Sequence, residues 1–248
     1  MPSLRKILSV IIVLAVGFFI LLPNLDFQFY LAQGDHGRDL YSFKKTFEGA
    51  VPYKDYSSLN GPLMPYYYSL FYHIFGVSIQ STLIGYYLII LLTGLLVFCA
   101  ARLYLDSFPA FICALWYWAF RGLGFYYTYN HCGALFLMIL VIYCLLAYIR
   151  TPGKKHIIAG LIALFLLLLI RPNIGAAAAA AFIVSMGLII AQQNIIQKAG
   201  KFLKVILCCL GVLFLSFFIY KFLTIGQPRH ITEDFSYYLQ AVDLKQIP

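Results

Sequence analysis

Long apolar runs separated by short polar connections dominate the hydrophobic pattern of this chain. A helix that crosses a bilayer needs about 20 consecutive apolar residues, and several runs reach or approach that length. The two shortest could be tilted, extended into their flanks or partly re-entrant. The pattern predicts an all-α polytopic membrane protein with about seven transmembrane helices: Leu8–Leu22, Ile79–Ala101, Phe108–Phe120, Cys132–Ile149, His156–Ile170, Ile174–Ala191 and Val205–Phe222.

Residues 24–78 form the one sizeable polar segment, and its pattern predicts two short surface helices. In Leu40–Phe47 an apolar stripe recurs with helical spacing and lysines stand opposite it, which is typical of a helix lying on a membrane surface. Gly49 follows as a stop signal. The stretch Leu63–Gly76 is rich in tyrosine, which favours the headgroup level of a bilayer. Two such helices, joined by a Pro/Gly-rich link, would roof a pocket.

Composition and charge agree with a membrane protein. Hydrophobic residues make up 62% of the chain and charged residues 11%, whereas a soluble domain carries roughly 25% charged residues. With the N-terminus in the cytoplasm, the inside segments hold nine of the 18 basic residues and a single acidic residue, Asp106, in agreement with the positive-inside rule. The net charge of +9 therefore reports topology, and no nucleic-acid partner is expected. The inside basic residues are Arg5, Lys6, Arg102, Arg150, Lys154, Lys155, Lys198, Lys201 and Lys204.

The sequence predicts one membrane domain over residues 1–248, with residues 24–78 and a tail, 225–248, outside. The first apolar run ends without a small-x-small cleavage site, so we expect a retained anchor and not a cleaved signal peptide. All six cysteines fall in or beside apolar runs. Their position favours core packing over a disulfide framework or a zinc site.

Carboxylates gather in the first polar segment, where five of the nine acidic residues fall between residues 24 and 60. Asp35 lies in Gly-Asp-His-Gly-Arg-Asp, whose glycines permit backbone geometries that other residues resist. A carboxylate so placed could act as a general base on a hydroxyl, with Arg38 and Asp39 as anion-binding and orienting groups. The alternative is a turn in which Asp35 pairs with Arg38.

Arg171 ends an apolar run and precedes Pro172. Its side chain could merely snorkel to the headgroups, or its fork could bind a lipid phosphate. Asp55 is either a second functional carboxylate or the partner of Lys54 or Lys45. His131 either contacts substrate or makes an interfacial hydrogen bond. Because 126–131 and 171–173 both fall outside, we expect them to converge near the first polar segment.

Four short motifs follow one another in the first polar segment: Asp35-His36-Gly37-Arg38-Asp39, Gly49-Ala50-Val51-Pro52-Tyr53-Lys54-Asp55, Gly61-Pro62-Leu63 and Phe75-Gly76. In this order and spacing they resemble the N-terminal half of the GT-C glycosyltransferase superfamily, in the group of the protein O-mannosyltransferases and lipid A aminoarabinose transferases. The resemblance implies an all-helical membrane fold with surface helices in the first outer loop. It also implies an inverting transfer of sugar from a polyprenyl-phosphate donor to a lipid, glycan or protein acceptor, at the outer face of a bacterial inner membrane.

By this resemblance Asp35 would activate the acceptor nucleophile and Arg171 would contact the phosphate of the donor. Arg38, Asp39 and Asp55 would shape the pocket, and Asn130-His131 falls near a further polar patch. Many members carry Glu after the loop Asp, where this chain has His36, so a divalent metal stays undecided and no other cofactor is implied. Members are commonly much longer, so the alternatives are a fragment, a truncated gene product that holds the GT-C core, and a minimal member.

The alternative function is a non-catalytic membrane protein that binds or transports a lipid-linked or small substrate. Transport is disfavoured because the apolar runs hold few ionisable residues, and intramembrane charges usually mark substrate pathways. The two hypotheses differ over Asp35→Asn, which should abolish turnover but leave donor binding in an enzyme.

Overall fold

The computed structural model describes residues 2–22, 35–122, 129–191 and 198–224, and within these ranges the regular secondary structure is helical. The helices are α1 (Pro2–Leu21), α2 (Asp35–Phe47), α3 (Leu63–Phe75), α4 (Ile79–Ala101), α5 (Ser107–Gly122), α6 (Tyr129–Arg150), α7 (Lys154–Ile170), α8 (Pro172–Ala191) and α9 (Lys198–Thr224). Each apolar run predicted from the sequence lies in one of these helices, except that Leu22 falls one residue past the end of α1. The all-α prediction is therefore confirmed for the described residues.

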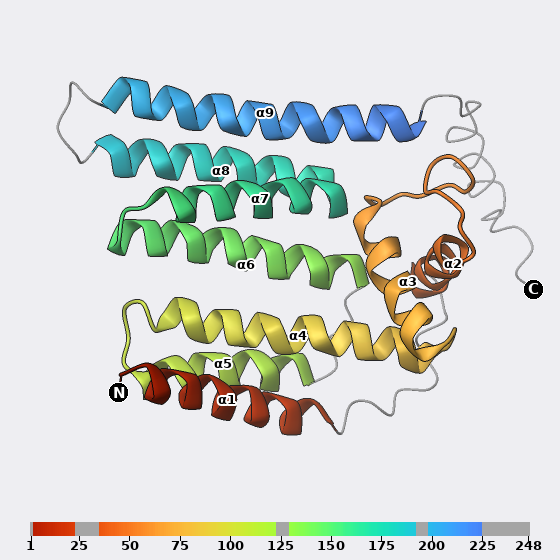
Figure 1. Ribbon diagram of the computed structural model, residues 1–248, viewed down its shortest axis with the longest axis horizontal. Helices are drawn as coiled ribbons and strands as arrows, with labels where there is room; N and C mark the ends of the chain where they lie inside the picture. The colour runs from red at the N-terminus through yellow and green to blue at the C-terminus, as the bar shows by residue number, and fades with distance from the viewer. Residues whose placement is uncertain (1, 23–34, 123–128, 192–197, 225–248) are drawn as a thin grey trace, which may run out of the picture.

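The long helices lie side by side, and α2 and α3 cross one end of the bundle, which we call the capped end (Figure 1). Helices α1, α4 and α5 form one group and α6 to α9 form a second. The packing of α4 against α6 joins the groups. The connections from α4 to α5 and from α6 to α7 lie at the opposite end (Figure 1).

Three helices of the described chain are long and apolar enough to cross a membrane: α4, α6 and α8. Shorter apolar helices occupy Ile7–Leu21, Ser107–Phe120 and Ile206–Ile219. By length and composition, the chain is a helical membrane protein.

Helix α2 begins at Asp35, five residues before the predicted surface helix, and it incorporates the glycine-rich motif that the sequence suggested as a turn. A glycine inside a helix costs only about 1 kcal/mol relative to alanine, so Gly37 does not stop the helix. Its apolar stripe also lies elsewhere than expected. Phe43 is 0% exposed and stacks on Tyr68 with ring centroids 4.4 Å apart, so the stripe packs on the protein and not on lipid.

Helix α3 confirms that the second predicted segment is helical, from Leu63 to its stop at Gly76; its position at the membrane surface stays a prediction. Gly76 has φ +82°, a left-handed conformation that glycine adopts without a steric penalty. Ser78 then caps α4, since its hydroxyl accepts a hydrogen bond from the backbone N–H of Ser81 at 3.1 Å. These two residues fix the corner between the helix that crosses the capped end and the membrane helix α4.

Candidate functional site

The first turn of α6 connects the helices of the capped end. It begins at Tyr129, three residues before the predicted membrane run. Asn130 Nδ2 donates a hydrogen bond of 2.9 Å to Asp39 Oδ2 of α2. Both residues are almost fully buried, at 2% and 3% exposed. This bond gives the buried amide nitrogen of Asn130 a hydrogen-bond partner, which a buried polar atom needs.

Arg38 and Asp35 flank this contact on α2. Arg38 Nη2 lies 3.6 Å from Asp39 Oδ1, which is an ion pair between neighbouring residues. Asp35 is the first residue of α2, one helical turn before Asp39. The side chain of Asp35 lies outside the described part of the structure, and its predicted role as a base stays a prediction.

Arg171 is the single extended residue between α7 and α8, with φ −144°. Its backbone N–H donates to Leu167 O at 2.8 Å, and its carbonyl accepts from the N–H of Gly175 at 2.9 Å. Pro172 opens α8, at the helix position where a missing N–H costs nothing. The helix ends thus hold Arg171 at the capped end from both sides.

The side chain of Arg171 is partly buried and contacts His131 in the first turn of α6. Its Nη1 lies 3.0 Å from His131 Nδ1 and also contacts Nε2. Because a guanidinium nitrogen can only donate, the imidazole accepts and is uncharged. No carboxylate of the described residues forms an ion pair with Arg171. The predicted convergence of these two polar segments is confirmed for His131 and Arg171.

An apolar groove of about 390 Å³ runs along α6 beside this contact. Its floor follows one face of α6, from His131 to Ile139, which at about 1.5 Å per residue is roughly 12 Å long. His131, with Arg171 bonded to it, stands at one end of this floor. The groove is lined by Tyr117 and Phe120 of α5, by His131, Ala134, Leu135, Met138 and Ile139 of α6, and by Ile174 of α8.

A second, polar recess lies between α2, the link that follows it and α6. Its volume is about 10 Å³, room for about one water molecule. Among the described residues, the recess between the two predicted surface helices and α6 is thus nearly filled by protein. The link is joined to α7 by a hydrogen bond of 2.8 Å, which the backbone N–H of Gly61 donates to the carbonyl of Ile170, the last residue of α7. The recess is lined by Arg38, Asp39, Ser42, Ser57, Ser58, Leu59, Asn60, Gly61, Pro65 and Asn130.

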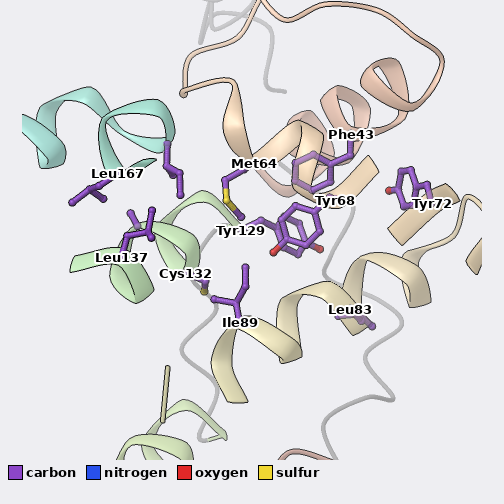
Figure 2. Close-up of a cluster of buried hydrophobic side chains, with 12 residues drawn as sticks. Phe43, Met64, Tyr68, Tyr72, Leu83, Ile89, Tyr129, Cys132, Leu137 and Leu167 are labelled. Atoms are coloured by element: carbon purple, nitrogen blue, oxygen red, sulfur yellow. The ribbon is translucent and has the colours of Figure 1, made fainter. Parts of the chain in front are cut away.

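Aromatic rings pack together where α2, α3 and the first turn of α6 meet (Figure 2). Phe43 of α2, Tyr68 of α3 and Tyr129 of α6 pack together, with the Tyr68 and Tyr129 ring centroids 5.3 Å apart. Burial raises the pKa of the Tyr68 phenol well above its ordinary value. Burial also raises the pKa of Tyr56 to about 12, and the hydroxyl of Thr46 at 2.7 Å opposes the shift. Both phenols are therefore neutral packing residues at physiological pH.

Asp55 closes a turn in the link between α2 and α3. Its carboxylate accepts a hydrogen bond of 2.8 Å from the backbone N–H of Val51. Lys45, one of its suggested partners, instead lies 3.1 Å from Glu48. Asp55 is exposed and is not among the residues that line the groove or the recess. The described residues contain no group of three His, Cys, Asp or Glu side chains able to hold a metal ion.

Asn130 is the site residue for which the sequence indicated no role beyond its place beside His131 in a polar patch. Its only signal was a polar residue within a tyrosine-rich strip, and its partner Asp39 lies 91 positions away. Searches against family profiles, characterised proteins and solved structures give no match. The resemblance to GT-C glycosyltransferases therefore depends on the motifs of the first polar segment alone.

Proposed function

We propose that the protein is a membrane glycosyltransferase that takes a sugar from a polyprenyl-phosphate donor. The observation that carries the proposal is Arg171, a partly buried cation whose side-chain partner is the uncharged His131, at the end of an apolar groove. A cation in this position favours an anion, and the groove favours a hydrocarbon chain. A lipid-linked phosphate has both.

Two helix ends add positive potential at the same point. Helix α6 starts at Tyr129 and α8 starts at Pro172, next to His131 and Arg171 respectively. The N-terminus of a helix carries a partial positive charge of roughly half a unit and presents free N–H groups, so it attracts phosphates. The helix dipoles thus act in the same direction as the arginine.

The orientation follows from charge. The ends of α4 and α6 and the start of α7, opposite the capped end, carry Arg102, Arg150, Lys154 and Lys155. By the positive-inside rule this end faces the cytoplasm, and the capped end faces outward. We infer that α1 and α4 to α9 all cross the membrane, in a bacterial-type inner membrane with a cytoplasmic N-terminus.

The proposed reaction is an inverting substitution. A hydroxyl or amine of a lipid, glycan or protein acceptor attacks the anomeric carbon, and Asp35 accepts the proton. The bond between that carbon and the phosphate oxygen breaks, and polyprenyl phosphate leaves with the electron pair. Arg171 stabilises the charge of the leaving phosphate in a site of low dielectric. The partners are membrane lipids, the donor and the acceptor.

Transfer of radiolabelled sugar from polyprenyl-phosphate donors to a membrane extract tests the proposal. Wild type should transfer label, and Asp35→Asn should lose transfer while it still binds the donor lipid. Asp106→Asn, an exposed acid at the opposite end, is the matched control and should keep transfer. Donor binding without transfer by the wild type would instead favour a non-catalytic membrane protein that binds a lipid-linked substrate.

A further inference from the structure

Helix α2 is joined to the bundle by two kinds of contact. The first is aromatic: Phe43 stacks on Tyr68 and meets the edge of Tyr129. Such packing holds α2 close to the bundle but resists sliding only weakly, because dispersion and hydrophobic contacts have little directionality. The second is the 2.9 Å hydrogen bond between Asn130 and Asp39, which is directional and fixes α2 against α6.

The chemistry of this hydrogen bond allows one orientation of the Asn130 amide. A carboxylate only accepts, so the amide nitrogen of Asn130 must face Asp39. The other amide atom, Asn130 Oδ1, has no hydrogen-bond partner within the described residues. Asp39 Oδ1 lies beside Arg38, and only 4% of the Asp39 side chain is exposed. This leaves the carboxylate of Asp39 little surface with which to contact a substrate.

Asn130 and His131 are neighbours in the first turn of α6, and consecutive residues of a helix point about 100° apart. One side chain therefore reaches α2 and the other reaches Arg171. The same helical turn sets the position of both. Asp35 opens α2 one turn before Asp39, so its backbone is held through the Asn130 contact.

We propose that Asp39 and Asn130 are positioning residues, which set the start of α2, and with it Asp35, relative to the cation Arg171. This inference depends on the proposed function, because positioning matters only if Asp35 and Arg171 act on one substrate. The bond itself, and not the charge of Asp39, is what the reaction requires. Asp39 is thus assigned a different role from the pocket residue that the sequence motif suggested.

Exchange of the two side chains separates geometry from charge. Asp39→Asn removes the charge, but Asn130 Nδ2 can still donate to the new amide oxygen at position 39, so kcat should fall by less than about threefold. Asn130→Asp places two carboxylates against each other and should lower kcat by about 10²-fold, the cost of a displacement near 1 Å. The double variant restores an amide–carboxylate pair and should recover most of kcat. KM for the donor should change little in all three.

Hydrogen exchange of the α2 amides supplies a readout without turnover. Exchange should accelerate in Asn130→Asp and return to the wild-type rate in the double variant, which also excludes simple misfolding. Ser69→Ala is the matched control, because it removes a hydroxyl in α3 that bonds only within its own helix.

Two results would overturn the inference: a loss of kcat in Asp39→Asn or in the double variant as large as the loss in Asn130→Asp, or unchanged exchange of α2 in Asn130→Asp. Absence of transfer by the wild type would instead refute the proposed function. Hydrogen exchange would then still decide whether the pair positions α2.

Discussion

Arg171 is placed by three separate contacts that the sequence presented only in part. The apolar run and the following proline marked it as a residue at the membrane boundary. An arginine at such a boundary usually finds its hydrogen-bond partners in water or lipid headgroups. In the fold, two helix ends hold its backbone, and its guanidinium is bonded to His131. These contacts therefore hold Arg171 in one position beside the groove. A side chain that merely snorkelled to the headgroups would sample many positions.

Pairs distant in sequence mark the limit of residue-level prediction. The candidates Asp39, His131 and Arg171 were found from their residue types, because charged and polar residues stand out in an apolar chain. The Asn130–Asp39 bond could not be found, because no local pattern links positions 91 residues apart. The turn bond of Asp55 to Val51 was missed for another reason: an acid near two lysines suggests an ion pair.

Tyr56 gives a prediction about pH. Its phenol ionises near 10 in an unfolded chain and at about 12 in the fold. Between these values the unfolded state has lost a proton that the folded state keeps, so the contribution of Tyr56 to the free energy of unfolding falls as pH rises. The difference in phenolate absorbance between wild type and Tyr56→Phe should have a midpoint of about 12.

Thr46→Val is the control for this titration. The Thr46 hydroxyl favours the ionised phenol, so its removal should shift the midpoint upward. A midpoint near 10 in the wild type would show that Tyr56 is not buried as described.

At the scale of elements, the sequence predicted the long helices well because a long apolar run has few alternatives to a helix. The predicted bounds of α4 agree with the structure at both ends. The start of α2 was wrong by five residues, since packing on α3 and α6 outweighs the weak helix propensity of Gly37. The face of α2 was also misassigned, because an apolar stripe alone does not say whether lipid or protein covers it.

Glycines in the membrane helices predict where packing is tightest. A Cβ at Gly94 of α4 would lie 2.2 Å from Trp118 Nε1, whereas a Cβ at Gly211 of α9 would meet nothing within 4 Å. Gly94→Ala should therefore lower the free energy of unfolding by about 1–3 kcal/mol. Gly211→Ala is the matched control and should be neutral or slightly stabilising. Unfolding in detergent measures both.

Trp118→Phe, which has a smaller ring, tests whether a clash with Trp118 causes the loss of stability in Gly94→Ala. Combined with Gly94→Ala, it should cost less than the sum of the two single substitutions, because the atoms that clash are absent. Strict additivity would mean that Gly94 and Trp118 are not in contact.

At the scale of the whole molecule, two groups of helices meet through α4 and α6, and the capped end spans their junction. The sequence indicated which segments are helical and which end is basic. It could not indicate which helices are neighbours, because apolar runs of similar composition can pack in many orders. The groove along α6 depends on that order, since α5, α6 and α8 all line it.

The proposed orientation predicts accessibility. Cysteines introduced as Lys54→Cys and Lys155→Cys replace exposed residues at opposite ends of the bundle. In intact cells a membrane-impermeant maleimide should label the first variant only, and permeabilised cells should give label on both. Labelling of Lys155→Cys alone in intact cells would reverse the topology and place Arg171 at the cytoplasmic face.

Photo-crosslinking of a polyprenyl phosphate that carries a photoreactive group in its hydrocarbon chain tests the central claim most directly. The account predicts adducts on Met138, Ile139 and Ile174, which line the groove, and their loss in Arg171→Gln but not in Lys44→Gln, an exposed cation on α2. Adducts spread over the surface of α9, or adducts in the groove that persist in Arg171→Gln, would contradict a lipid-phosphate site at Arg171.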